Sequence, residues 1–383
     1  DERASQIETT VLPMLSNDKV CVFFIDDVNR KTTILEELLQ VKNSYGGKIK
    51  IVLTIRDYAC KEFTKNHPLI ADHIYNVISL SDDCITEILE SSPYGIKNQD
   101  FKERIESISK GNLRLAIMCA ELAIQENGFC KLVKDVPSLY DTYFSKHIAE
   151  IGDNEYNVLS ACAIFRCLKQ GEPATKLILD FCKIDDATFN TTVSRLESNE
   201  CSEIWRYDDG KAIKIIDQIF ATYLVYDSVF RKQIYSLSKI LDIFFHSHKH
   251  VITDTIGGVL TAYRSTNVGD IISESVNRYA KKVKSNNDLF KEAIETFGFF
   301  MPEEALCYYD SYVSTLPQNE AYEFSTDDNL SNFINYNDNI ITQLIQYFNH
   351  EDNISNLAFD ILYKYCECCP EKLPELVHWI KKD

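Results

Sequence analysis

The sequence is short of glycine and proline and has no long apolar segment. Its 383 residues include 12 glycines and 9 prolines, and 45% of all residues are hydrophobic. Because helix-breaking residues are few and the apolar content is high, we expect a folded, mainly helical chain of about two to four domains. No run of about eighteen apolar residues is present, so we expect no membrane-spanning helix. A signal peptide is not visible either, and we expect a soluble, cytoplasmic protein.

Basic residues are fewer than acidic residues. Lys and Arg number 40, and Asp and Glu number 58, which gives a formal net charge of −18 at pH 7. Repulsion between such a chain and a polyanion disfavours general binding to nucleic acid or to anionic membranes. A local basic patch is still compatible with this charge. We expect neither DNA nor a membrane among the partners.

Ligand spacing typical of zinc sites is also missing. The 13 cysteines are scattered through expected helices and strands, as in reduced proteins of the cytosol. Cys366, Cys368 and Cys369 lie close together, but no Cys or His pair at zinc spacing accompanies them. The histidines of H-S-H-K-H, residues 246–250, would fan around a helix axis instead of converging. Neither cluster predicts a metal site.

A short apolar run that ends in two carboxylates organises the N-terminal part of the chain. Val20 to Ile25 reads V-C-V-F-F-I and is followed by Asp26 and Asp27. Such a run predicts a strand covered on both faces, as in a parallel sheet. Ligands bind beyond the carboxyl ends of such strands, where paired carboxylates suit hydrated Mg²⁺ and an oriented water. The alternative is a buried strand that ends in a solvated turn, because D-D-x-N is favourable turn sequence.

A helix and a second strand are expected next. Residues 31–43 carry apolar side chains at helical spacing, and Tyr45-Gly46-Gly47 ends that helix. Residues 49–55 form another apolar run, followed by Arg56. Strand, helix and strand in so short a segment make a βαβ unit, whose strands run parallel.

Parallel strands would bring the polar residues at their ends to one edge of the sheet. Asp26 and Asp27 end the first strand, and Thr54 and Arg56 end the second. Carboxylates for a metal beside an arginine for a phosphate form the arrangement that phosphoryl transfer requires. Taken alone, Arg56 reads as a surface arginine after a strand.

Further along, residues 74–80 form a third short β-like run, and Ser81 or Asp82 is expected to cap a new helix. Residues 101–126 are strongly helical but are interrupted by G-N-L-R. We expect one helix to end at Gly111 and Asn112 and the next to carry Arg114 in its first turn. A helix N-terminus with an arginine attracts phosphate, whereas the alternative is a helix–helix turn with an exposed arginine.

Three segments together resemble the nucleotide-binding domain of P-loop ATPases of the AAA+ and STAND type. V-F-F-I-D-D-V (residues 22–28) resembles their Walker B strand, and I-V-L-T-I-R-D (residues 51–57) resembles their sensor 1 strand. G-N-L-R-L-A (residues 111–116) resembles their sensor 2 helix. The order of the three segments along the chain and the number of residues between them are also similar to those of that family. The resemblance covers residues 1–230 and is closest to bacterial STAND proteins, whose antiviral members recognise a phage protein.

This resemblance implies a site for ATP or ADP and Mg²⁺. In that site Asp26 would bind the metal and Asp27 would activate the attacking water. Arg56 and Arg114 would sense the γ-phosphate. The residues expected to contact the nucleotide are Arg114, Thr54 and Asn112.

The glycine-rich phosphate-binding loop of that family is missing. No G-x-x-x-x-G-K-[ST] occurs in the sequence, although this loop and its lysine supply most of the phosphate contacts. In the family it would lie upstream of Asp1. We therefore expect the C-terminal part of a larger protein. This chain alone would hold half a nucleotide site and would hydrolyse little ATP.

Helical segments and a hairpin follow after a boundary at Gly152. Residues 155–169 are expected to be helical, and a second helix is expected at residues 186–198. Two alternating segments around D-D-G predict a hairpin at Asp209-Gly210. Helices followed by a hairpin are typical of a winged helix. Its acidic surroundings disfavour DNA recognition, and the resemblance implies that it packs over the nucleotide.

The last part of the chain reads as successive amphipathic helices. Pairs with a proline near the turn, as at Pro302, Pro370 and Pro374, are typical of an α-solenoid of HEAT or TPR type, although no clean repeat is found. The expected fold is mainly α with a partial α/β core. Its domains are the AAA+-like core at 1–80, the helical lid at 81–151, the winged helix at 152–228 and the helical repeats at 229–383.

The expected function is that of a regulatory ATP-binding module in a STAND-type signalling NTPase. A protein ligand on the helical repeats would drive homo-oligomerisation and activate an effector, in antiviral defence if the closest resemblance holds. Two alternatives belong to other classes. One is a non-enzymatic helical scaffold with a degenerate nucleotide site, and the other is a transcription regulator that uses its winged helix.

Overall fold

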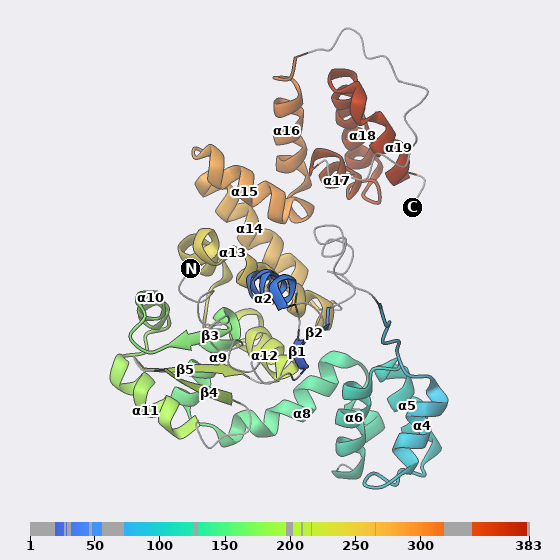
Figure 1. The fold of residues 1–383 in the computed structure, drawn as a ribbon, viewed down its shortest axis with the longest axis vertical. Coiled ribbons are helices and arrows are strands. Elements are labelled where there is room, and N and C mark those ends of the chain that lie inside the picture. The colour runs from blue at the N-terminus through green and yellow to red at the C-terminus, as the bar shows by residue number, and fades with distance from the viewer. Residues whose placement is uncertain are drawn as a thin grey trace. The chain divides into compact units, whose positions relative to one another are not determined.

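Over its described residues, the computed structural model of the chain is mainly helical, with two small sheets (Figure 1). The chain divides into two compact units, residues 1–78 (unit 1) and 79–383 (unit 2), which are described separately. Within the ranges given below, no helix combines the length and the apolar character needed to cross a bilayer. The structure describes residues 20–26, 28, 32–45, 48–55, 73–125, 129–196, 202–207, 210–215, 217–264, 266–317 and 339–380.

Unit 1 contains the predicted βαβ arrangement. Strands β1 (Cys21–Ile25) and β2 (Ile49–Leu53) pair in parallel, with Cys21 opposite Ile49 and Ile25 opposite Leu53. Helix α2 (Thr32–Tyr45) connects them. Its apolar positions pack against one face of the sheet, because apolar side chains at helical spacing form a single stripe. The core consists of Ile25, Val28, Leu35, Leu38, Val41 and Ile49.

The other face of this sheet is exposed, which corrects the prediction of a strand covered on both faces. Val22 and Phe24 of β1 are 63% and 65% exposed, and Val52 of β2 is 47% exposed. Side chains alternate between the two faces of a strand, and α2 covers only one of them. The continuous apolar run correctly predicted a strand. It did not predict which face of the strand is covered.

The third β-like run is not a strand in the structure. Residues 73–80 have no regular secondary structure, and Ile74, Tyr75 and Val77 are largely exposed. A strand requires a hydrogen-bonded neighbour, and the backbone bond made here is from Leu80 N to Gly111 O (3.0 Å). The prediction failed because apolar composition does not supply that neighbour.

The first helices of unit 2 begin at capping side chains, and the predicted cap at Ser81 is confirmed. The Ser81 side chain accepts a hydrogen bond from Cys84 N at the start of α4, and Asn98 caps α5 in the same way. Asp135 and Ser138 form a capping box at the start of α8. The elements are α4 (Asp82–Glu90), α5 (Gln99–Ser109), α6 (Leu113–Gln125), α7 (Phe129–Leu132) and α8 (Val136–Glu150).

Gly111 makes the turn between α5 and α6 possible. Its φ is +78°, and a Cβ placed there would lie 2.4 Å from Leu80 O. Only glycine allows both this backbone conformation and this close approach. The break predicted at Gly111 and Asn112 is confirmed.

A three-stranded sheet and three helices follow. The predicted hairpin is confirmed, since β4 (Ser202–Tyr207) and β5 (Gly210–Ile215) pair antiparallel. Asp209 lies outside the described residues. The helix expected at 155–169 ends at Phe165, because residues 167–169 form a strand on the outer side of β5, in the order β3-β5-β4. The other elements are α9 (Asp153–Phe165), β3 (Cys167–Lys169), α10 (Pro173–Cys182) and α11 (Asp186–Leu196).

The remaining elements that the structure describes in unit 2 are helical (Figure 1). Helix α12 (Gln218–Val225) continues directly into the π-helical segment η3 (Tyr226–Arg231). Helix α13 has a kink at His248, within the histidine-rich stretch. The remaining elements are α13 (Leu237–Ala262), α14 (Val268–Val283), α15 (Asn287–Phe297), η4 (Gly298–Phe300), α16 (Pro302–Val313), α17 (Asn339–Ile345), α18 (Asp352–Cys368), η6 (Pro370–Lys372) and α19 (Leu373–Ile380).

Candidate functional site

Two of the predicted site residues meet at the carboxyl edge of the parallel sheet in unit 1. Thr54 Oγ1 donates a hydrogen bond to Asp26 Oδ1 at 2.5 Å. The backbone fixes this approach, because Thr54 N donates to Ile25 O (3.0 Å) and Val28 N donates to Thr54 O (2.9 Å). The expectation that the ends of both strands share one edge is confirmed for this pair.

The chemistry of this edge suits a hard cation. Asp26 is exposed and Thr54 is partly buried, so the two side chains present carboxylate and hydroxyl oxygens at the surface. Mg²⁺ prefers such oxygens and is commonly held by one or two carboxylates together with water. Among the residues that the structure describes, no three His, Cys, Asp or Glu side chains group closely enough to hold a metal by themselves. A carboxylate and a hydroxyl that meet at this edge fit a hydrated Mg²⁺ that takes few protein ligands.

Asp27 and Arg56 lie outside the described residues. Their proposed roles in water activation and phosphate sensing remain predictions.

The predicted sensor 2 residues lie in unit 2 and have partners within the chain. Asn112 accepts a hydrogen bond from Leu115 N (3.2 Å), so its side chain caps α6. Arg114 Nη2 donates to Asp217 Oδ2 at 2.6 Å. Asp217 also caps α12 by accepting from the backbone of Ile219 (2.8 Å). The pair thereby connects the first turn of α6 to the N-terminus of α12.

The Arg114–Asp217 pair is partly open to solvent. Roughly half of the Arg114 side chain and a quarter of the Asp217 side chain are exposed. Burial by itself lowers the pKa of Arg114, but the hydrogen bond and the charge of Asp217 outweigh it and raise this pKa above its ordinary value. The guanidinium is therefore permanently charged and is accessible to a competing anion.

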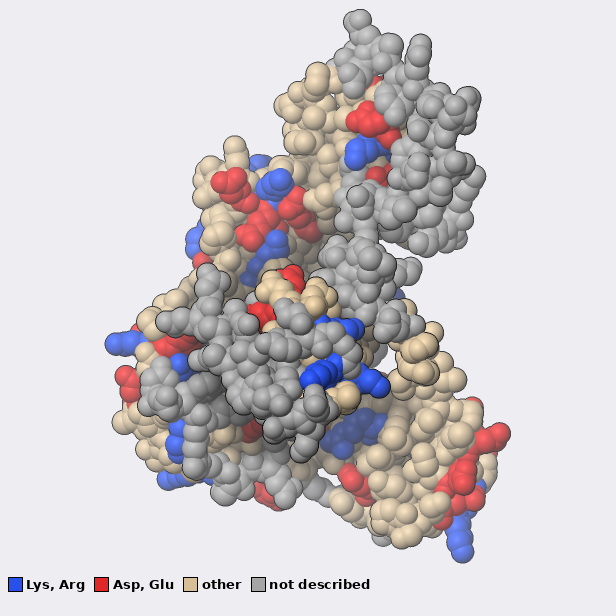
Figure 2. All heavy atoms as spheres, viewed as in Figure 1, with Lys and Arg blue, Asp and Glu red and all other residues tan. Residues whose placement is uncertain are grey.

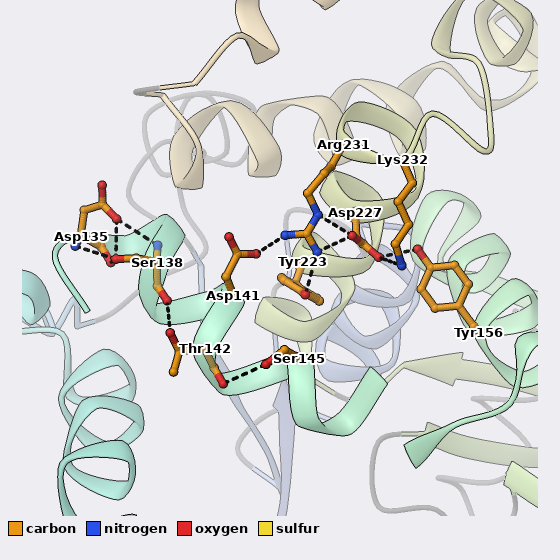
Figure 3. A network of polar contacts seen from close by, with 10 residues as sticks. All are labelled: Asp135, Ser138, Asp141, Thr142, Ser145, Tyr156, Tyr223, Asp227, Arg231 and Lys232. Atoms are coloured by element: carbon orange, nitrogen blue, oxygen red, sulfur yellow. Dashed lines mark hydrogen bonds and ion pairs between the residues drawn. The ribbon is translucent and has the colours of Figure 1, made fainter. Parts of the chain in front are cut away.

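A buried carboxylate that the sequence analysis missed lies in the π-helical segment η3. Asp227 is fully buried and accepts hydrogen bonds from Tyr156 Oη (2.6 Å) and Arg231 Nε (2.6 Å) (Figure 3). Lys232 Nζ lies 2.7 Å from Asp227 Oδ2, the oxygen that also accepts the hydrogen bond from Tyr156. These three donors come from α9 and from the end of η3, so the carboxylate joins the two elements.

Arg231 extends this network to α8. Its Nη1 donates to Asp141 Oδ1 at 2.5 Å, and its Nη2 donates to Tyr223 Oη at 2.9 Å (Figure 3). Lys232 also lies 4.5 Å from the centre of the Tyr156 ring, a cation–π distance. We call Asp227, Arg231, Lys232, Tyr156 and Asp141 the Asp227 cluster.

The Asp227 cluster is suited to holding helices together and not to acid–base catalysis. Burial raises the pKa of Asp227, but hydrogen bonds from Lys232, Tyr156 and Arg231 outweigh it and leave the pKa below its ordinary value. A carboxylate stabilised in this way is a poor base near neutral pH. One sequence signal was available, because Asp227 and Arg231 are four residues apart on a helical segment. Nothing in that spacing indicated burial.

Charges of both signs are interspersed on the described surface that Figure 2 shows. Helix α11, which corresponds to the helix expected at residues 186–198, has a single basic residue, Arg195, and that residue pairs with Glu155 (3.2 Å). This helix therefore lacks the basic surface of a DNA reader.

Comparison with protein-family models, curated proteins and solved structures returns no match.

Proposed function

We propose that the chain is the C-terminal part of a STAND-type signalling ATPase. In this proposal unit 1 is the second half of an AAA+-like core, and α4–α8 form the helical lid. Residues 152–228 are a winged-helix domain that runs from α9 through α12, and residues 229–383 form a helical-repeat sensor. A protein ligand bound to the repeats would promote homo-oligomerisation and activate an effector. By the resemblance to antiviral STAND proteins, this response would serve antiviral defence.

The observation that carries the proposal is the Asp26–Thr54 pair at the carboxyl edge of a parallel βαβ unit. In open α/β sheets this edge is where ligands bind. When bound, Mg²⁺ would neutralise phosphate charge, and Asp26 with Thr54 would hold it. Asp27 would orient a water, and Arg56 would bind phosphate.

The chain's own ion pairs suggest how the lid and the winged helix are coupled. Arg114 of α6 pairs with Asp217 at the start of α12, and Asp141 of α8 pairs with Arg231 at the end of η3. Both ends of α12–η3 are thus tied to the α4–α8 segment. In the proposed mechanism nucleotide would favour one arrangement of these parts, and ligand on the repeats would favour another.

The test is ATP turnover by a longer protein that includes the phosphate-binding loop proposed to precede this chain. We expect Asp27→Ala and Arg56→Ala each to lower turnover by about 100-fold or more, as for loss of a transition-state contact. Asp83→Ala, which removes an exposed carboxylate at the start of α4, is the matched control. Unchanged turnover in both site variants would refute the assigned roles.

A non-enzymatic scaffold is the second candidate function. The hydrogen bond between Arg114 and Asp217 favours it, because Asp217 already gives this arginine an anionic partner in place of a nucleotide phosphate. The scaffold predicts that the longer protein has no phosphate-binding loop and binds no ATP.

A further inference from the structure

The outer face of α18 carries aromatic side chains where a surface helix usually carries polar ones. Phe359 is 52% exposed and Tyr363 is 59% exposed. Because they are four residues apart, their side chains are neighbours on one side of the helix. Phe348, which follows α17, extends this apolar surface, with its ring centre 6.3 Å from that of Phe359.

Acidic residues accompany the two aromatic rings. Asp352, Asp360 and Glu367 are exposed and recur at the spacing that places them on the same side of α18 as Tyr363. The one basic residue of α18, Lys364, pairs with Asp310 of α16 at 2.8 Å. The pKa of Lys364 is raised first by its hydrogen bond with Asp310 and also by the charge of Asp360, which lies close by, four residues earlier. The exposed face therefore combines apolar area with more carboxylates than cations among the described residues of α18.

This combination identifies a kind of partner. Exposed apolar area on a helix is stabilised when another apolar stripe packs on it, and the carboxylates favour a cationic polypeptide over an anionic one. Lysine or arginine side chains could also lie over the faces of the Phe359 and Tyr363 rings. An anionic membrane would be repelled by the same carboxylates.

We propose that the outer face of α18 binds a basic amphipathic helix of a partner protein. The partner's apolar stripe packs on Phe359 and Tyr363, and its lysines or arginines face Asp360 and Glu367. The identification of this partner with the sensed ligand rests on the proposed function. The binding itself does not require nucleotide.

Binding can be measured with the chain itself. The probe is a fluorescein-labelled peptide of about eighteen residues, long enough to form a marginal helix, with leucines on one face and lysines on the other. A second peptide has glutamate in place of every lysine. Fluorescence anisotropy should show binding of the lysine peptide that weakens with salt, and binding about tenfold weaker or more for the glutamate peptide.

Two double variants locate the site. Phe359→Ser with Tyr363→Ser should weaken the lysine peptide about tenfold or more, as expected for aromatic anchors. Asp360→Asn with Glu367→Gln should weaken it about threefold to tenfold and reduce the salt dependence. Circular dichroism would verify that these surface changes leave the fold intact.

Matched controls remove equivalent groups elsewhere on unit 2. Ile234→Ser with Ile243→Ser removes two aliphatic side chains of similar exposure, and Asp270→Asn with Asp288→Asn removes two exposed carboxylates. We expect both controls to bind the lysine peptide within about twofold of the original chain.

Three results would overturn the inference. The first is unchanged binding of the lysine peptide by the α18 variants. The second is equal weakening in the control variants, which would indicate general attraction to an acidic chain. The third is self-association of the chain that the Phe359 and Tyr363 changes abolish, which would assign the face to a second copy. Failure here would leave the ATPase proposal intact, because that proposal is tested by Asp27 and Arg56. Loss of ATP turnover in the longer protein would likewise leave this binding result unaffected.

Discussion

At the scale of single residues, Asp227 shows how a buried charge is tolerated. Removing a carboxylate from water is costly unless donors replace the lost hydration. Tyr156, Arg231 and Lys232 supply those donors, and both cations keep part of their surface in solvent. Asp227 is fully buried and receives all three donors, so it is the residue of the cluster whose loss should matter most.

We expect Asp227→Asn to lower the free energy of unfolding by about 2–4 kcal/mol, somewhat less than for a fully buried ion pair because Arg231 and Lys232 are partly exposed. Asp141→Asn removes the half-exposed partner of Arg231 and should cost less than about 1 kcal/mol. Urea denaturation of the three proteins measures both values. Equal costs for the two variants would contradict the assignment of Asp227 as the central residue.

The effect of Asp227→Asn should also depend on pH. Because the folded-state pKa of Asp227 is lowered, its ionised form contributes stability above the unfolded-state value of about 4. That contribution is lost as the pH falls from there through the lowered pKa. The difference in unfolding free energy between the original chain and the variant should therefore be largest at about pH 6–7. It should shrink below about pH 4. A difference that grows on acidification would contradict this sign.

At the scale of elements, Asp217 combines two functions. It caps α12 through the backbone of Ile219 and Phe220, and it pairs with Arg114 of α6. The cap belongs to α12 alone, whereas the pair connects α12 to the α4–α8 segment. Substitutions can separate the two contributions.

Asp217→Ala should cost about 1–2 kcal/mol of unfolding free energy, because both the cap and the pair are lost. Asp217→Asn keeps a good capping residue and should cost less than about 1 kcal/mol, similar to Arg114→Gln, since each removes a partly exposed pair. Thermal or urea unfolding at low and high salt distinguishes the terms, because salt screens the pair and not the cap. If Asp217→Asn lowered the free energy of unfolding as much as Asp217→Ala, the helix cap would not be the larger of the two contributions of Asp217.

At the scale of the whole molecule, the two units have separate cores. The core of unit 1 contains six buried side chains among the described residues, whereas a continuous apolar core runs through the helices and the antiparallel sheet of unit 2. The two parallel strands and one helix that the structure describes in unit 1 bury too little surface to be stable by themselves. Unit 2 has enough core to fold alone.

We expect residues 79–383, produced alone, to show helical circular dichroism and a cooperative thermal transition. Residues 1–78 alone should show neither, because one face of their sheet exposes Val22, Phe24 and Val52. The intact chain provides the reference melting curve. An unfolded 79–383 fragment would show that unit 2 depends on unit 1.

Sequence patterns predicted local structure well where one residue type has one physical role. The strand before Asp26, the break at Gly111 and the hairpin at Asp209-Gly210 were predicted from apolar or alternating runs and from glycine, and the structure contains the strand, the break and the antiparallel β4–β5 pair. Cys167–Lys169 was predicted as helix and is a strand, because pairing with β5 is a contact between distant segments.

The sequence by itself determined the βαβ unit, the cap at Ser81 and the meeting of Asp26 with Thr54, because parallel strands joined by a short crossover must end at the same edge. Only the tertiary structure decided the partners of the charged residues. Arg114 pairs with Asp217 across 103 positions, and Tyr156 donates to Asp227 across 71. Such pairings depend on how helices pack, and packing follows from the summed burial of many apolar side chains, which no local pattern contains.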